Sequence, residues 1–188
     1  VMRLAGGHAK FGDPWHSQCG EVAWAHAIGW QVAFPSNAED AVGLLRAAMR
    51  SHNPTIFFEH RALLDDASAR RPYPGDQYVL PFGCGKVVQP GSDLTIVSWG
   101  AMIARCAAAI EQTGISVELI DLRSIMPWDR ELVIKSVQKT RRCLIVHEDS
   151  STAGFGAEIA ATVASEAFLD LDAPVERLTV PDVPLPYN

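Results

Sequence analysis

The chain has 188 residues, 48% hydrophobic and 20% charged, which is typical of a folded globular protein with one large or two small domains. Its net charge of −6 and isoelectric point near 5.5 argue against nucleic acid or an anionic membrane as a partner, and no apolar run approaches the roughly 20 residues that span a bilayer. The four cysteines are scattered without CxxC spacing, which predicts reduced, mostly buried thiols rather than a structural zinc site or a disulfide framework.

The first 60 residues alternate between strand and helix patterns. The N-terminal VMRLAGG reads as a strand, and 30–35 (WQVAFP) alternates in hydrophobicity up to Pro35. Residues 36–52 repeat apolar side chains at helical spacing, and Ser36 or Asn37 is the expected N-cap. Residues 53–60 form an apolar run that indicates a strand buried on both faces, as in a parallel sheet.

Residues 61–80 differ in character because they mix charged residues with prolines and a glycine, which indicates a connector between domains. A second alternation follows, in which 90–93 (PGSD) resembles a hairpin turn. The expected strands are 94–100, 116–122, 142–148 and 174–180, and the expected helices are 101–114, 129–140 and 154–168. Strands that alternate with helices in this way predict a parallel, doubly wound α/β fold.

Ligands of open α/β sheets bind at the carboxyl ends of the strands, and three stretches are expected there: 5–18, 99–102 and 147–156. The glycines of GFG (154–156) lack the spacing of a phosphate-binding loop, so they indicate close packing of a helix on its strand. His147 and Glu148 could form an acid/base pair. They could equally form a polar pair at a subunit contact, and this second interpretation is favoured.

His16 is the strongest catalytic candidate among the histidines. It lies in an irregular loop rich in glycine and proline, next to Ser17 and Gln18, where an imidazole can point into a cleft and transfer a proton. Ser17 has no recognisable base and acid partners, so a serine hydrolase triad is not indicated. The sequence contains no HExxH motif and no Asp-rich metal-binding loop.

Several longer motifs together are more specific than any of them alone. They include GGHAKFGDPWHSQ, SHNPTIFFE, GSDLTIVSWGAM, ELIDLRSIMPWD, SVQKTRRCLIVHE and GFGAEIAA, in this order. This series closely resembles the beta subunit of thiamine-diphosphate-dependent 2-oxo acid dehydrogenases, a family that includes pyruvate, branched-chain and acetoin dehydrogenases. The resemblance covers nearly the whole chain.

The resemblance implies a fold and a set of site residues. Residues 1–64 are implied to be the C-terminal part of a pyrimidine-binding domain, 65–80 a linker, and 81–188 a transketolase C-terminal-type domain with a mostly parallel sheet. His16 matches the histidine that reaches the thiamine site between subunits, where it is implied to assist acyl transfer. The loop at the end of the first helix matches a monovalent-cation site in some members of the family. Its implied ligands, largely through backbone carbonyls, are Ala48, Met49, Ser51 and Asn53.

The implied reaction is oxidative decarboxylation of a 2-oxo acid with acyl transfer to lipoamide. Thiamine diphosphate and Mg²⁺ would be bound mainly by an alpha subunit, and K⁺ by the loop above. The implied partners are this alpha subunit, a second beta subunit and a lipoyl acyltransferase, in the cytoplasm or, in a eukaryote, the mitochondrial matrix. The family's cofactor-activating glutamate falls upstream of residue 1. The family also continues past residue 188, so we expect a chain truncated at both ends and inactive alone.

Two other interpretations stay open. The chain could belong to another thiamine enzyme of the transketolase superfamily, such as an acetoin dehydrogenase or a deoxyxylulose-phosphate synthase. It could also serve as a non-catalytic assembly module. Heat released on mixing with thiamine diphosphate and Mg²⁺ would argue against the module.

Overall fold

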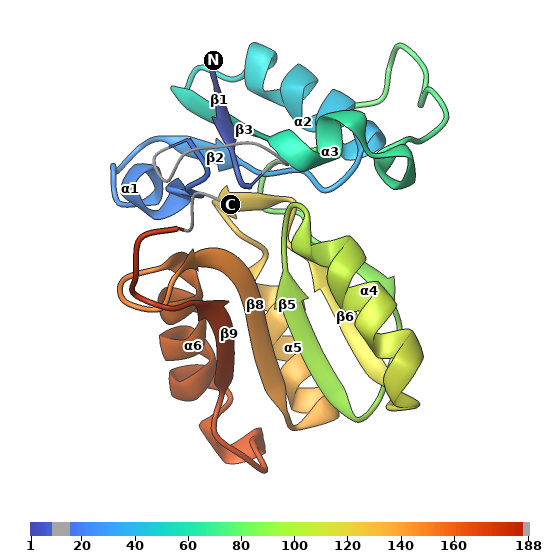
Figure 1. Cartoon of the computed structure of the whole chain (residues 1–188), viewed down its shortest axis with the longest axis vertical. Helices are drawn as coiled ribbons and strands as arrows, with labels where there is room; N and C mark the ends of the chain where they lie inside the picture. The colour runs from blue at the N-terminus through green and yellow to red at the C-terminus, as the bar shows by residue number, and fades with distance from the viewer. Residues whose placement is uncertain (9–15, 186–188) are drawn as a thin grey trace.

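The computed structural model describes residues 1–8 and 16–185, which form two β-sheets placed one above the other in Figure 1. The first sheet has the strand order β1-β3-β2-β7 and the second has the order β4-β6-β5-β8-β9. Each sheet is parallel except for one antiparallel edge strand, β7 in the first and β4 in the second. The strands are β1 (Met2–Gly6), β2 (Gln31–Ala33), β3 (Thr55–His60), β4 (Lys86–Gln89), β5 (Leu94–Ser98), β6 (Val117–Asp121), β7 (Ser124–Met126), β8 (Cys143–Ser150) and β9 (Glu176–Val180).

The first sheet is built around the apolar strand β3, which has β1 and β2 as parallel neighbours. Five of the six residues of β3 are buried, so the prediction of a strand covered on both faces is confirmed. Helix α2 (Ala38–Arg50) follows β2, and Asn37 caps it by accepting a hydrogen bond from the backbone N–H of Asp40. Helix α3 (Arg61–Asp65) begins directly after β3.

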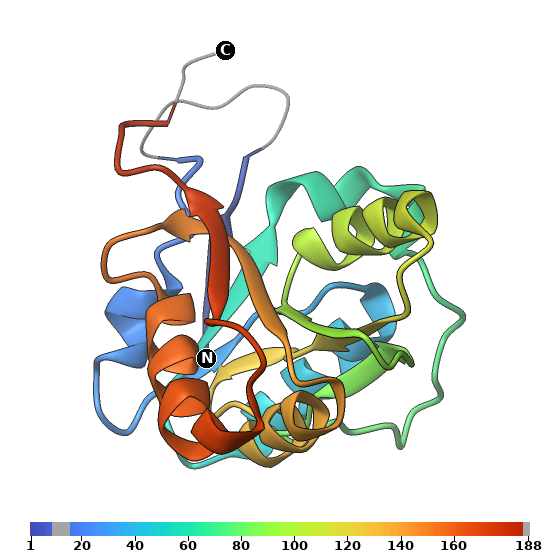
Figure 2. The same cartoon turned by 90° about the horizontal axis from the view of Figure 1, so that it is seen from below.

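The second sheet has helices on both faces, as Figure 2 shows from below. Successive residues of one strand point to opposite faces, and neighbouring side chains of β5 therefore join different cores. Ile96 packs with helix α4 (Met102–Thr113), whereas Val97 belongs to the core that includes helices α5 (Arg130–Thr140) and α6 (Phe155–Glu166). The predicted doubly wound α/β architecture is confirmed.

The two halves of the chain contribute to one sheet and to one core. Strand β7 comes from the second half of the chain, yet it pairs with β2 of the first sheet. The largest core cluster is continuous across both sheets, since it contains Phe34 and Phe58 from the first part and Ile120 and Ile125 from the second. The division at residues 64 and 81 therefore describes the order along the chain, whereas in space the segment 81–188 also completes the first sheet.

The predicted linker packs against helix α2. A short 3-10 turn, η1 (Ala67–Ala69), is followed by irregular chain up to β4. The Arg46 guanidinium of α2 donates hydrogen bonds to the carbonyl oxygens of Gly75 (2.6 Å) and Tyr78 (3.0 Å). Leu80 is buried in the same cluster as Leu44. Residues 65–80 thus connect the two halves as a segment fixed to the first one.

The hairpin expected at residues 90–93 is wrong. Strands β4 and β5 are consecutive in the chain but lie on opposite sides of β6. The turn crosses the start of β6, where the backbone N–H groups of Ser92 and Asp93 both donate to the carbonyl of Ser116. A Cβ on Gly91 would lie 2.1 Å from the carbonyl carbon of Val117, so only glycine allows this close crossing.

Candidate functional site

The carboxyl ends of four parallel strands meet where the two sheets face each other, and the stretches predicted from the sequence converge there. The backbone N–H of Gly7, after β1, donates to the carbonyl of Gln18 at 3.3 Å. The Trp99 indole N–H, after β5, donates to the Glu21 carboxylate at 2.9 Å. Glu148, near the end of β8, binds His60 at the end of β3. The site therefore joins both halves of the chain.

His16 is exposed, while its neighbour Ser17 is buried. Residues 9–15 of the predicted loop lie outside the described residues. The chain on the other side of the loop is fixed by the Gly7–Gln18 hydrogen bond. The two ends of the loop are thus held together, and the exposed His16 imidazole is accessible to a second polypeptide. The predicted catalytic role requires this accessibility.

Glu21 follows the loop and connects its end to Trp99. It is the first residue of the short helix α1 (Glu21–Ala25) and is fully buried. One carboxylate oxygen accepts the Trp99 indole N–H, and the other, Oε2, has no hydrogen-bond partner within the described structure. Burial, together with the nearby Asp149 carboxylate, raises the pKa of Glu21 to about 8. At neutral pH Glu21 is thus mostly a neutral carboxylic acid.

His147 is a packed core residue. Its ring stacks on Trp99 with centroids 5.2 Å apart and an interplanar angle of 11°, and its Nδ1 accepts a hydrogen bond from the Asp149 backbone N–H. Burial lowers its pKa to about 4, and the positive charge of Arg177 acts in the same direction. A Cβ at Gly154 or Gly156 would lie 2.7 or 2.4 Å from ring atoms of His147. The prediction that the GFG glycines serve helix packing is confirmed.

His147 and Glu148 do not form a pair with each other, which corrects both interpretations of this dipeptide. Adjacent residues of a strand point to opposite faces, so His147 enters the core while Glu148 leaves it. The partner of Glu148 is His60 of the same chain, with 2.5 Å between Nε2 and Oε2. Sequence reasoning did not single out His60, although it is the last residue of an apolar parallel strand, the position where site residues are expected.

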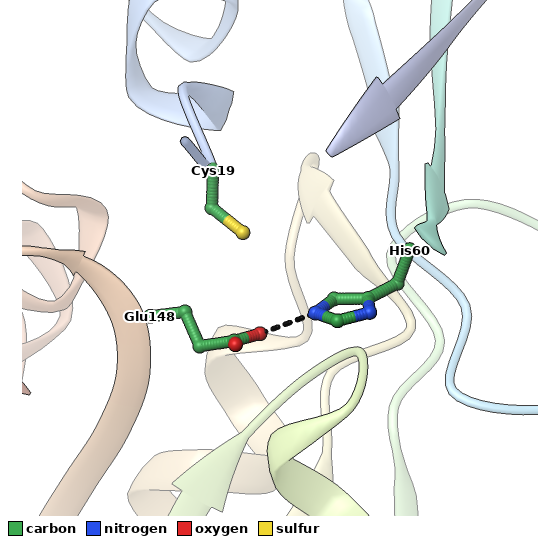
Figure 3. Close-up of side chains that lie close together, drawn as sticks. All are labelled: Cys19, His60 and Glu148. Carbon is green, nitrogen blue, oxygen red and sulfur yellow. Dashed lines mark hydrogen bonds and ion pairs between the residues drawn. The ribbon is translucent and has the colours of Figure 1, made fainter. Parts of the chain in front are cut away.

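A third side chain, Cys19, completes a cluster with His60 and Glu148 (Figure 3). The thiol and the imidazole are buried, whereas the Glu148 side chain is 19% exposed. Burial raises the pKa of the Cys19 thiol well above its ordinary value, and Glu21, Glu148 and Asp149 add to the effect. Glu148 also lines an open pocket of about 130 Å³, together with Gln18, Asp149, Ser150, Val180, Val183, Pro184 and Leu185.

Three aromatic residues near the site lie in or against the core. Trp99 and Phe155 are 3% exposed and pack edge to face, and Trp128 packs against Phe155 in the same way.

The described cysteines are all free thiols, and three of the four are buried. No helix in the described part of the chain is long and apolar enough to cross a membrane.

The four residues of the predicted cation loop lie at the C-terminal end of α2 and in the turn before β3. The carbonyl of Ala48 accepts the Ser51 N–H, and the Ser51 hydroxyl accepts the Asn53 N–H. The Met49 thioether is a soft ligand that does not suit a hard cation, so any contribution from Met49 would come from its backbone carbonyl. Carbonyl and hydroxyl oxygens suit a hard cation, and the assignment of these residues as ligands remains a prediction.

The first sheet is extended by β7, which comes from the second half of the chain, and the second sheet has five strands. These two sheets, with a polar site between their strand ends, define the transketolase class of two-domain folds. The sequence profile described as "Transketolase, pyrimidine binding domain" matches residues 1–66. The profile described as "Transketolase, C-terminal domain" matches residues 83–188. The chain belongs to this transketolase family, and its predicted resemblance is confirmed.

Two curated relatives and one solved structure are similar to the chain along nearly its whole length. The chain is 43% identical over 189 residues to "2-oxoisovalerate dehydrogenase subunit beta 2, mitochondrial" of Arabidopsis thaliana, covering 99% of this chain and 52% of that protein. It is 37% identical to "2-oxoisovalerate dehydrogenase subunit beta" of Bacillus subtilis, covering 100% and 58%. Among solved structures, "Split gene transketolase, inactive beta4 tetramer" is similar with a TM-score of 0.73 and 26% identity, covering 96% of this chain and 56% of that one. The chain thus spans about half the length of the curated relatives it matches.

Proposed function

We propose that the chain is part of the beta subunit of the decarboxylating component of a 2-oxo acid dehydrogenase complex. The observation that carries the proposal is the 43% identity to a named beta subunit along 99% of the chain. The corresponding reaction is oxidative decarboxylation of a 2-oxo acid, followed by acyl transfer to lipoamide. The partners are an alpha subunit, a second beta subunit and a lipoyl acyltransferase.

His16 is the residue of this chain proposed to act on the reacting groups. Its exposure would let the imidazole enter a cleft shared with the alpha subunit and transfer a proton during acyl transfer. Gln18 and the buried Glu21 hold the base of the loop through Gly7 and Trp99. Thiamine diphosphate, when bound mainly by the alpha subunit with Mg²⁺, supplies an electron sink for the carbanion left by decarboxylation.

The remaining cofactor and location assignments belong to the same proposal. The oxygen atoms of Ala48, Met49, Ser51 and Asn53 are proposed to bind K⁺ and so to fix the turn between α2 and β3. The location is the cytoplasm, or the mitochondrial matrix in a eukaryote, as the name of the Arabidopsis relative supports.

The proposal is tested by combining the complete protein with its alpha partner, thiamine diphosphate and Mg²⁺. Release of CO₂ is measured with pyruvate and branched-chain 2-oxo acids, and reduction of an artificial electron acceptor is measured with the same acids and with acetoin. We expect release from at least one 2-oxo acid by the pair, and none from the present 188-residue chain alone. Activity of this chain alone, or a pair inactive on every 2-oxo acid, would contradict the proposal.

A non-catalytic assembly role is the second candidate, because the similar solved structure is named as an inactive beta4 tetramer. This role predicts that the complete protein self-associates and that the alpha–beta pair releases no CO₂ from any 2-oxo acid, even where the pair binds thiamine diphosphate and Mg²⁺. The CO₂ assay of the pair therefore separates the two candidates. A deoxyxylulose-phosphate synthase would instead condense its substrates without an external electron acceptor.

A further inference from the structure

We propose that Cys19, His60 and Glu148 form a binding site for a borderline divalent cation of the Zn²⁺ class. The Cys19 sulfur, a His60 ring nitrogen and a Glu148 carboxylate oxygen all lie within 4.8 Å of one another. They come from three separate segments: the loop before α1, the end of β3 and the end of β8. Figure 3 shows the thiol and the imidazole directed toward the carboxylate.

The donor set determines the class of metal. Thiolate, imidazole and carboxylate together suit zinc and similar ions, whereas Ca²⁺ and Mg²⁺ prefer oxygen ligands alone. Three protein ligands leave one coordination position for water or another small ligand. Because the three residues are 41 and 88 positions apart in the sequence, no short spacing motif could have indicated the site.

The geometry argues against the other chemistry that a cysteine and a histidine can perform. A nucleophilic cysteine needs a base that accepts its proton. Here His60 Nδ1 accepts the Ala62 backbone N–H at 3.2 Å, so Nε2 carries the ring proton and donates it to Glu148. The thiol is also buried among carboxyl groups, and its pKa is raised, which disfavours a metal-free thiolate.

A divalent cation would compensate the carboxylates of Glu148 and Asp149, which lie close enough to raise the pKa of the Cys19 thiol. Binding would release the thiol proton and move the neutral imidazole's proton from Nε2 to Nδ1. The Nδ1–H would then face the Ala62 N–H, so the first turn of α3, where Ala62 is exposed, has to shift until water accepts from these two donors.

The metal also has a route to the cluster. Glu148 is both a member of the cluster and a wall of the 130 Å³ pocket, and its side chain is partly exposed. Glu148 is thus the ligand of the cluster that an ion in the pocket would reach first.

The experiment uses the purified full-length protein, treated with a reductant and a chelator and then titrated with Co²⁺ as a spectroscopic probe. We expect one equivalent to bind with a thiolate-to-cobalt charge-transfer band, which Zn²⁺ then abolishes. Each bound ion should release one proton, measured with an indicator in weak buffer, because only the thiol loses its proton to solvent.

Two variants and one control assign the band. Cys19→Ser should abolish the charge-transfer band, while Glu148→Gln should keep it but weaken binding by roughly 100-fold. Cys84→Ser is the matched control, because Cys84 is a free thiol on the surface, and it should bind as the wild type does. Circular dichroism checks the fold, and if Cys19→Ser does not fold, Glu148→Gln carries the test. Absence of the band in the wild type, a band that survives Cys19→Ser, or unchanged binding in Glu148→Gln would overturn the proposal.

Discussion

Replacement of Glu21 by glutamine should make the protein less sensitive to alkaline pH. The side chain is fully buried and accepts the Trp99 indole N–H at 2.9 Å. Glutamine has nearly the same shape, and its carbonyl oxygen can accept the same hydrogen bond. The substitution therefore removes the titrating group while it keeps the packing and the contact to Trp99.

The sign and size of the effect follow from the raised pKa. The folded state holds the Glu21 proton up to a pKa of about 8, whereas the unfolded chain releases it near 4.5. The stabilisation is therefore complete below the unfolded value and is lost as pH rises through about 8. At about 1.4 kcal/mol per pKa unit, the total loss is about 5 kcal/mol, of which roughly 2 kcal/mol falls between pH 6 and pH 8.

Urea unfolding of wild type and Glu21→Gln, followed by circular dichroism from pH 5 to pH 9, measures this difference. The free energy of unfolding of the wild type should decrease relative to the variant as pH rises. Glu111→Gln, at an exposed position on α4, is the control and should follow the wild type. A difference between wild type and Glu21→Gln that does not change with pH would refute the reasoning.

Two further substitutions test the packing and the second buried acid. Gly156→Ala places a Cβ 2.4 Å from His147 Nε2 and should lower the free energy of unfolding by about 1–3 kcal/mol. Gly20→Ala, with open space around the added Cβ, should change it by less than about 0.5 kcal/mol. Equal effects of the two in thermal unfolding would contradict this account. Asp121 accepts the Ser36 hydroxyl at 2.5 Å, and burial raises its pKa to about 7. As pH rises from 4 to 8, the free energy of unfolding of Asp121→Asn should thus increase by about 4 kcal/mol relative to that of the wild type. Parallel pH profiles of the two proteins in urea unfolding would instead show that Asp121 is ionised in the folded state.

The sequence predicts the regular elements of the fold well where local signals are strong. Helix α5 lies within the expected helix 129–140, and Asp129 caps it because its carboxylate accepts the Leu132 N–H. Strand β7 was missed because it has only three residues and forms by pairing with β2, about 90 positions earlier. The hairpin error at residues 90–93 has a similar cause. A turn sequence specifies a change of direction, whereas the neighbour of each strand is decided by packing on β6.

The sequence predicted which stretches of the chain form the candidate site, but it did not predict which side chains contact each other there. The rule that sites lie at strand carboxyl ends selected the stretches around His16, Trp99 and His147, and the structure brings them together. Contacts such as His60–Glu148 join residues 88 positions apart, and no pattern along the chain encodes them. The opposite orientations of His147 and Glu148 follow from strand geometry, so they could be predicted once both residues were assigned to one strand.

The most direct measurement of the central claim compares His16→Ala with wild type in the complete protein assembled with its alpha partner. Two rates are measured: CO₂ release with an artificial electron acceptor, and acyl transfer to a lipoyl domain. We predict that acyl transfer falls by about 100-fold or more, as expected for loss of a proton-transferring residue, while CO₂ release falls much less. His26→Ala, at another exposed histidine, should leave both rates unchanged. Acyl transfer at the wild-type rate in His16→Ala would contradict the account.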